Sequence, residues 1–492
     1  MAKLPKNFKT IAPPYIFQTD TIDYGIRRYN AGLLLDLGLG KTYCAINIAR
    51  YLIQNKGIKK ILTVLPAGVM LNWQNEIEKF SEYKAIVLHD SVRKKRLQLI
   101  DTFANYKIPF GIINYEALPL FFKELTSFKI DAIIIDESSR YISNKDSNRT
   151  KALIGYTYKK LKVVGISDRI PYRYLLTGTL IRNKPMGIWS QFRFLDGGAT
   201  FGTNFYSWKN YFFNEVNSGG YKKWIIRKER IPYLHKKIYQ SCIRFEKREV
   251  FKQLPPITYV KYEIKMPPKL NSEYKIVREQ VLSEIENEFG SKAYLNITNI
   301  LTKFIRLQQI TSGFIKDENN NLHVLKQTPK LDMLIDQLAE ITDQGESAII
   351  WCKFRPSIAL IAKHLTKLKY NHVVMTGSDN PKEKYRKWKG FQESKTINIF
   401  LGQITAGGIG IELFKKDTVD KFQHTLFYEY TWVLDDRIQA IGRNDGRIGQ
   451  TSACRVVDLV IKGSIDEKML GIVLDNKKIA DLITTGDIRN VI

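Results

Sequence analysis

The first half of the chain alternates short apolar runs with stretches in which apolar residues recur at helical spacing. The runs are bounded by turn residues and read LLLDL, ILTVLP, IVLH, GIINY, IDAIIID and YLLTGT. Strands that alternate with helices in this way form a parallel sheet with helices packed on its faces. The pattern therefore predicts an α/β lobe.

A second series of apolar runs follows Pro329 and has the same organisation. Its strands are predicted at SAIIWC, HVVMTG, TINIFLG, HTLFYEY and ACRVVDLVI, so we expect two α/β lobes. Pro255 and Pro256 interrupt helix and central strand alike, which places the boundary of the first lobe near residue 250. Between the two series, apolar residues spaced three and four apart predict an amphipathic helix, namely Tyr274, Val277, Val281, Ile285 and Phe289.

One predicted strand leads directly into a glycine-rich segment and then into a helix. The segment is Gly38, Leu39, Gly40, Lys41 and Thr42. Glycines let the backbone approach phosphates, the first turn of the helix offers free amide groups, and the Lys and Thr side chains suit the β and γ phosphates and magnesium. The segment predicts a phosphate-binding loop, although Leu35 stands where the full GxxxxGK[ST] pattern has its first glycine.

An acidic pair ends another predicted strand. Asp136 and Glu137 follow the apolar residues of IDAIII. A carboxylate at this place can hold the magnesium ion that a phosphate loop requires, and a second can orient and deprotonate the attacking water. The alternative is an acidic pair that merely caps a strand end. We favour the metal site, because the upstream loop needs such a partner.

Composition limits the class of protein. The 492 residues allow two to four domains, and 44% hydrophobic content excludes an intrinsically disordered chain. No apolar run reaches the roughly 18 residues that a membrane span needs, so we expect a soluble, cytoplasmic protein that does not bind membranes. The four cysteines lie far apart and predict neither a disulfide framework nor a zinc site.

The net charge of +28 is unevenly distributed. Residues 151–250 carry 20 Lys and Arg against 6 Asp and Glu, and residues 351–400 carry 11 against 3. Clustered positive charge is typical of proteins that bind a polyanion such as nucleic acid. The alternative is a solubilising basic surface.

Two basic stretches contain interleaved aromatic residues, at residues 221–230 (YKKWIIRKER) and 382–390 (KEKYRKWKG). Such mixtures suit phosphate contacts combined with stacking on bases or sugars. An amphipathic helix with its aromatic side chains in the core explains either stretch equally well. For Trp73, further upstream, we favour a core position over a stacking role.

The motifs together resemble those of the superfamily 2 helicase and translocase ATPases, most closely the Swi/Snf branch. Matching segments follow the family's order along nearly the whole chain, among them PPYIFQ, LDLGLGKT, LPAGVMLNWQNEIEKF, DESSR, LLTGTLIRN, IIWCKF, ITAGGIGIEL and QAIGRNDGRIGQ. The resemblance implies two tandem RecA-like lobes with parallel sheets flanked by helices. The lobes are expected at 1–250 and 326–492, with a basic helical insertion at about 200–240 and a helical protrusion or linker at 251–325.

The resemblance also implies roles for individual residues. ATP would be bound by Gln18, which reads adenine, and by Gly38, Gly40, Lys41, Thr42, Asp136, Gly410 and Gln439. Magnesium would be held by Thr42 and Asp136, and hydrolysis would depend on Lys41, Asp136, Glu137 and two arginine fingers, Arg443 and Arg447. Coupling to nucleic acid would involve Thr177, Gly178, Thr179, Thr405, Gly407 and Gly408.

Two departures from the family pattern concern these roles. Ser139 stands where DEAH proteins have histidine, although its hydroxyl can still form hydrogen bonds. Three residues separate Arg443 from Arg447 where the Swi/Snf pattern has two, so which arginine reaches the γ phosphate is open. Neither departure removes a magnesium or phosphate ligand.

The leading hypothesis is a monomeric, ATP- and Mg²⁺-dependent enzyme that moves on double-stranded or branched DNA, in replication or recombination. A strand-separating helicase acting on RNA or DNA is the alternative. A third hypothesis is a nucleotide-switched nucleic-acid-binding module without significant turnover. The acidic pair and the two arginines of the last motif count against this third hypothesis.

Overall fold

The chain divides into two compact units, Met1–Lys252 with Asn476–Ile492, and Gln253–Asp475. The structure is a computed structural model and describes residues 3–158, 161–181, 185–218, 221–291, 297–317, 319, 321–405, 413–415, 421–445 and 450–485. The division lies two residues before the Pro255 and Pro256 pair.

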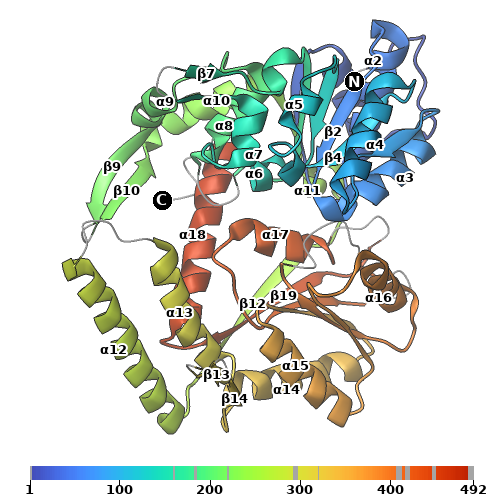
Figure 1. The fold of residues 1–492 in the computed structure, drawn as a ribbon. Helices are drawn as coiled ribbons and strands as arrows, with labels where there is room; N and C mark the ends of the chain where they lie inside the picture. The colour runs from blue at the N-terminus through green and yellow to red at the C-terminus, as the bar shows by residue number, and fades with distance from the viewer. Residues whose placement is uncertain are drawn as a thin grey trace. The chain divides into compact units, whose positions relative to one another are not determined.

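The first unit is built on a seven-stranded sheet in the order β11-β1-β8-β5-β2-β4-β3 (Figure 1). All neighbouring strands in it are parallel. The strands are β1 (Asn30–Leu35), β2 (Ile61–Leu65), β3 (Ala85–Val87), β4 (Phe110–Asn114), β5 (Ala132–Ile135), β8 (Tyr172–Thr177) and β11 (Cys242–Phe245). Every residue of β2, β4 and β5 is buried, as in a parallel sheet covered on both faces.

Helix α1 (Ile16–Ile26) precedes β1, and further helices of the first unit follow the strands. These include α2 (Lys41–Lys56), α3 (Met70–Phe80), α4 (Arg93–Asn105), α5 (Phe122–Leu125), α6 (Ser138–Tyr141), α7 (Asn148–Ile154) and α8 (Gly187–Asp196). Helix α2 packs against α1 and α3. It begins after Gly40 and ends at Gly57, and both glycines take the left-handed backbone that ordinary residues avoid, with φ of 78° and 66°.

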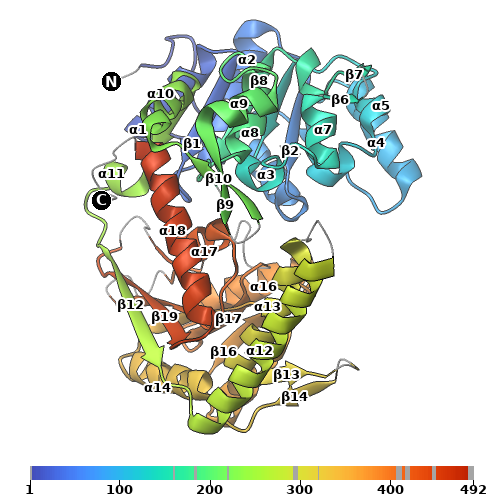
Figure 2. The same cartoon turned by 90° about the vertical axis from the view of Figure 1, so that its left-hand side faces the viewer.

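The basic insertion of the first unit contains a β-hairpin as well as helices. Helix α9 (Phe205–Phe212) leads into the antiparallel strands β9 (Phe213–Ser218) and β10 (Tyr221–Ile226), and α10 (Ile231–Ser241) follows. Figure 2 shows the hairpin projecting away from these helices. An entirely helical insertion at about 200–240 is therefore wrong for 213–218 and 221–226. β-Branched and aromatic residues on both sides of an Asn-Ser-Gly-Gly sequence favour strands joined by a tight turn.

The second unit contains a six-stranded parallel sheet in the order β12-β19-β18-β15-β17-β16. Its strands are β12 (Ile257–Ile264), β15 (Ser347–Cys352), β16 (His372–Met375), β17 (Ile399–Gln403), β18 (Gln423–Phe427) and β19 (Cys454–Ile461). Strand β12 lies in the region 251–325 for which we expected helices. It pairs along its whole length with β19, because its partly alternating pattern suits an edge strand.

The helices of the second unit include the amphipathic helix expected around Tyr274, which is α12 (Pro268–Ser291). The others are α13 (Ile297–Thr311), α14 (Pro329–Asp343), α15 (Arg355–Lys367), α16 (Pro381–Glu393), α17 (Leu434–Gly442) and α18, which begins here (Ile465–Thr485). Tyr274 and Val281 of α12 are buried in a core cluster with Trp351 and Phe400. The buried side chain of Arg437 joins α17 to β19 through two contacts of 2.7 Å with Asp458.

The predicted fold class, two α/β lobes with parallel sheets flanked by helices, is confirmed. Each apolar run singled out in the sequence contains a strand. Among the described residues, no helix has the length and apolar character required to cross a membrane.

Candidate nucleotide-binding and coupling site

The carboxyl ends of three adjacent strands gather the predicted residues of the first unit. Strand β8 pairs with β1 on one side and with β5 on the other, all in parallel. The glycine-rich loop follows β1, the acidic pair follows β5, and Thr177 ends β8. Because parallel strands end at the same edge of a sheet, the three motifs share one edge, which is where ligands bind in open α/β sheets.

The glycine-rich loop has the backbone geometry of a phosphate cradle. Gly38 and Gly40 have φ of 84° and 78°, and α2 begins at Lys41 with Thr42 in its first turn. The Lys41 ammonium donates to the Leu35 carbonyl at 2.8 Å, which holds the cation at the start of the loop. Free amides at the start of α2 and a cation beside them favour the binding of phosphate oxygens.

Gln18 on α1 contacts this loop directly. Its side-chain Nε2 donates to the Leu39 carbonyl at 3.1 Å, and its Oε1 accepts a hydrogen bond from the Tyr15 amide at 3.0 Å. A methyl group placed on Gly40 would lie 2.6 Å from the same Nε2. The structure thus brings Gln18 and the phosphate loop together, 21 residues apart in sequence.

Asp136 is buried, with 8% of its surface exposed. Its Oδ2 accepts a hydrogen bond from the Trp73 indole at 3.1 Å, and its Oδ1 accepts one from the Glu137 amide at 2.9 Å. Burial, together with the charge of Glu137, raises the pKa of Asp136 to about 7, against the opposing effects of the Lys41 charge and the Trp73 hydrogen bond. A carboxyl group that titrates near neutral pH is typical of functional sites.

Trp73 is a core residue, as we favoured, because it is only 2% exposed. Its hydrogen bond to Asp136, however, gives it a place in the site that the sequence does not indicate. Tyr115 supports the same turn from another direction, since its hydroxyl donates to the Asp136 carbonyl at 2.7 Å.

Glu137 has a strained backbone. Its φ is 53°, a left-handed conformation that costs a residue other than glycine roughly 1–3 kcal/mol. The helix α6 starts immediately after it. Such strain is typical of residues whose position matters more than local stability.

Ser139 connects the acidic motif to the motif that ends β8. Its hydroxyl lies 3.1 Å from the Thr177 hydroxyl, and Thr177 in turn donates to the Thr179 carbonyl at 2.9 Å. A Cβ on Gly178 would lie 3.5 Å from the Lys41 ammonium. Ser139 thus supplies a hydroxyl where DEAH proteins have histidine. Its hydrogen bond joins the acidic motif to the Thr177–Thr179 segment, which lies next to the phosphate loop.

The donors at this edge fit a magnesium ion. Magnesium is usually held by one or two carboxylates together with substrate phosphates and water, rather than by a complete protein cage. Asp136 offers a buried carboxylate beside the loop, and Thr42 lies in the first turn of α2. Within the described part of the chain, no group of three or more His, Cys, Asp or Glu residues forms a separate metal site.

The second unit contributes fewer of the predicted residues. Gln439 on α17 and Arg443 at the end of that helix are 3% and 6% exposed, and Gln439 donates to Asp435 at 3.0 Å. Thr405 follows β17 and is exposed. Four predicted residues lie outside the described residues, namely Gly407, Gly408, Gly410 and Arg447.

A charged residue that the sequence analysis missed organises the corresponding edge of the second sheet. The Glu429 carboxylate, just after β18, is fully buried and accepts hydrogen bonds from the amides of Lys353 and Phe354 at 2.7 and 2.8 Å and from the Ser357 hydroxyl. It therefore fixes the loop after β15. The signal was a glutamate between the apolar residues of the HTLFYEY run.

The basic aromatic stretches have different structures. Residues 221–226 form strand β10, so a helix is wrong there, and the Trp224 ring lies 3.5 Å from the Lys209 ammonium. Residues 382–390 lie in helix α16. There Trp388 packs against the core, as an amphipathic helix requires, whereas Tyr385 is 57% exposed.

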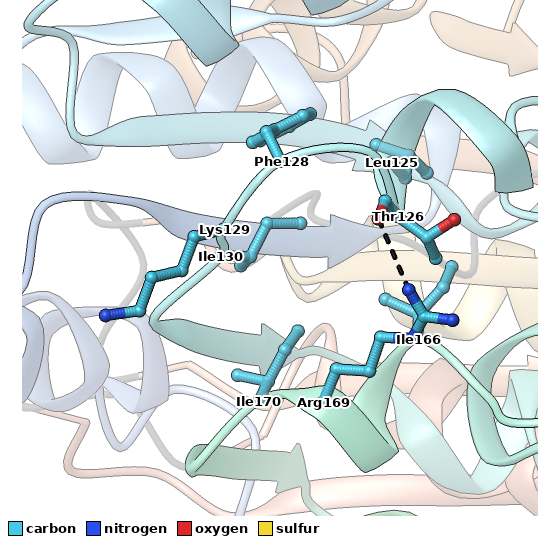
Figure 3. A pocket seen from close by; sticks show the side chains of 8 residues that line it. All are labelled: Leu125, Thr126, Phe128, Lys129, Ile130, Ile166, Arg169 and Ile170. Carbon is cyan, nitrogen blue, oxygen red and sulfur yellow. Dashed lines mark hydrogen bonds between the residues drawn. The ribbon is translucent and has the colours of Figure 1, made fainter.

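A cavity of about 240 Å³ in the first unit lies away from these motifs (Figure 3). Leu125, Phe128 and Ile130 line it before β5, and Ile166 and Ile170 line it before β8. It is therefore at the amino ends of these strands, whereas the motifs are at their carboxyl ends.

Comparison with known families accounts for this arrangement. The SNF2-related domain matches residues 17–313, and the helicase conserved C-terminal domain matches residues 329–449. The chain belongs to the SNF2-related family. The resemblance read from the motifs is thereby confirmed.

SNF2-related relatives with curated names include helicases and chromatin remodellers. The chain is 26% identical to an uncharacterized ATP-dependent helicase of Mycoplasma genitalium, over 89% of this chain and 39% of the relative. It is 27% identical to the probable ATP-dependent DNA helicase CHR23 of Arabidopsis thaliana, over 92% and 42%. The chain thus spans about two fifths of the length of these relatives.

Among solved structures, the SWI2/SNF2 ATPase core of Sulfolobus solfataricus in complex with double-stranded DNA is 21% identical. The match covers 99% of this chain and 96% of that one, with a TM-score of 0.45.

Proposed function

We propose that the protein is an ATP-dependent translocase that couples ATP hydrolysis to movement on double-stranded or branched DNA. The observation that carries the proposal is the assembly of three motifs at adjacent strand ends. The Lys41 loop, the Asp136–Glu137 pair and the Thr177 segment lie after β1, β5 and β8. SNF2-related membership and the strongly positive net charge support the same activity.

The residues of the first unit have distinct roles in this proposal. The loop amides and Lys41 bind and orient the ATP phosphates, while Gln18 holds the loop from α1 and is placed to read adenine. Magnesium held by Asp136 and Thr42 would neutralise charge on the β and γ phosphates. Glu137 orients the attacking water and takes its proton. Arg443 and Arg447 would stabilise charge on the transferred phosphoryl group.

Coupling to DNA is proposed to pass through hydrogen bonds. Ser139 contacts Thr177 at 3.1 Å, so a shift of the acidic motif during hydrolysis displaces the segment from Thr177 to Thr179. That segment, with Thr405, Gly407 and Gly408 of the second unit, would contact the nucleic acid. A cytoplasmic location, a monomeric state and a role in replication or recombination stay predictions.

The phosphate loop is tested with Lys41→Ala. We expect DNA-stimulated ATP hydrolysis to fall to background while binding of duplex DNA is retained, because the lysine contacts phosphates of ATP only. Lys56→Ala is the matched control, since this exposed lysine ends the same helix. Retained turnover in Lys41→Ala would overturn the assignment of the loop.

The substrate is tested by measuring the ATPase rate with blunt duplex DNA, forked DNA, single-stranded DNA and duplex RNA. We expect the DNA duplex and fork to stimulate hydrolysis most. Stronger stimulation by RNA would contradict the DNA assignment. A triplex-displacement assay beside a strand-displacement assay then separates translocation from unwinding, and ATP binding without phosphate release would indicate a nucleotide-switched binding module.

A further inference from the structure

The basic insertion of the first unit exposes aromatic rings beside cations. Tyr206 on α9 is 62% exposed, and its ring centre lies 5.6 Å from that of Phe205. The ammonium groups of Lys145 and Lys209 each lie 5.5 Å from the centre of this ring. Lys209 also lies 3.5 Å from the Trp224 ring, so it links α9 to the hairpin strand β10.

The combination recurs on the same insertion. Tyr211 and Tyr233 are 41% and 43% exposed, and their ring centres are 6.1 Å apart. Arg230 lies 4.3 Å from the Tyr211 ring and donates to its hydroxyl at 2.8 Å. These contacts hold the rings in place, so little side-chain entropy is lost when a ligand packs on them.

The insertion is basic throughout. Residues 205–237 contain eight Lys and Arg and two Asp and Glu. Cations next to exposed rings match one ligand in particular, a nucleotide whose base stacks on the ring while its phosphate meets the ammonium group. An acidic peptide would satisfy the charges but would leave the rings exposed to water.

Only some forms of nucleic acid offer a nucleotide whose base face is free to stack on a protein ring. In an intact duplex each base face is covered by its neighbours, so a protein ring can stack only on an unpaired base or at an end. We propose that Tyr206, flanked by Lys145 and Lys209, binds unpaired bases, so that the insertion directs the protein to the single-stranded arms of branched DNA. This inference rests on the proposed function and narrows its substrate from duplex or branched DNA to branched DNA.

The experiment measures binding of the full chain, without nucleotide, to three fluorescent DNA probes, a blunt duplex, a fork with two single-stranded arms and a single strand. Tyr206→Leu removes the ring and keeps an apolar side chain, and Tyr206→Phe keeps the ring. Tyr106→Leu is the matched control, because Tyr106 is equally exposed, at 65%, in another part of the unit. A fourth probe carries the fluorescent base 2-aminopurine in one arm, which is quenched when it stacks.

We expect Tyr206→Leu to weaken binding of the fork and the single strand by roughly 5-fold or more, with little change for the blunt duplex and with loss of 2-aminopurine quenching. Tyr206→Phe and Tyr106→Leu should resemble the unmodified protein. Equal weakening on all three probes would indicate a backbone contact and would overturn the inference, as would unchanged binding of every probe.

Tighter binding of single-stranded RNA than of single-stranded DNA would also overturn the inference. Triplex displacement on a blunt duplex distinguishes this failure from failure of the proposed function. If Tyr206→Leu changes no probe but the protein still displaces a triplex, translocation stands and the base-binding role falls. If no displacement occurs in the unmodified protein, the proposed function itself fails.

Discussion

The hydrogen bond from Trp73 to Asp136 makes a sharp prediction about the pH dependence of hydrolysis. Trp73→Phe keeps most of the buried ring and removes the indole N–H that donates to Asp136 Oδ2 at 3.1 Å. That hydrogen bond stabilises the ionised carboxylate and so lowers the pKa of Asp136, which burial has raised to about 7. Removing the donor must therefore raise the pKa further.

The size of the shift follows from general magnitudes. A hydrogen bond to a charged group contributes about 1.5–3 kcal/mol, and one pH unit corresponds to about 1.4 kcal/mol, so the pKa rises by about one to two units. Binding of magnesium needs the carboxylate, which forms as the pH rises through the pKa. The acidic limb of the profile of kcat/KM for ATP should therefore move up by about one to two units.

The assay is the steady-state ATPase rate with saturating duplex DNA between pH 6 and 9.5. At pH 7 we expect kcat/KM of Trp73→Phe to be about 5- to 50-fold below that of the unmodified protein, with recovery toward pH 9. Trp189→Phe is the matched control, since this buried indole Nε1 has no hydrogen-bond partner among the described residues. A loss in Trp73→Phe by the same factor at every pH would refute the reasoning, because it would indicate altered packing instead of altered ionisation.

Two further predictions concern the phosphate loop at Gly40 and the hydrogen bond between Ser139 and Thr177. Gly40→Ala should lower the melting temperature and weaken ATP binding more than Gly57→Ala. Both positions have positive φ, but only at Gly40 would the added methyl group meet Gln18, at 2.6 Å. Calorimetry and ATP titration of the two variants measure the difference, and equal effects would exclude the clash as the cause. Ser139→Ala should leave basal hydrolysis nearly unchanged and reduce the stimulation by DNA roughly 5-fold, the equivalent of about 1 kcal/mol for one lost hydrogen bond to Thr177. Ser139→Thr keeps the hydroxyl and should retain the stimulation. A parallel loss of basal and stimulated ATPase rates in Ser139→Ala would contradict a coupling role.

The strand predictions succeeded because their signals are local. Each interior strand that was predicted contains a short, mostly apolar run bounded by turn residues, and this pattern is visible within a few residues. The edge strands β11 and β12 escaped notice because charged and polar residues are mixed into their runs, whereas the opposite edge strands β3 and β16 are mostly apolar and were predicted. The hairpin β9–β10 was missed for the same reason, because its lysines and asparagines break the apolar run.

The sequence by itself determined the α/β class, the phosphate loop and the acidic pair, because a strand followed by a Gly-rich turn and a helix is a short-range pattern. Only the tertiary structure decided that Trp73 contacts Asp136 and that Ser139 contacts Thr177, across 63 and 38 residues. These contacts depend on the order β1-β8-β5-β2, which places strands distant in sequence side by side. No local periodicity encodes that order, since it results from the packing of helices on the completed sheet.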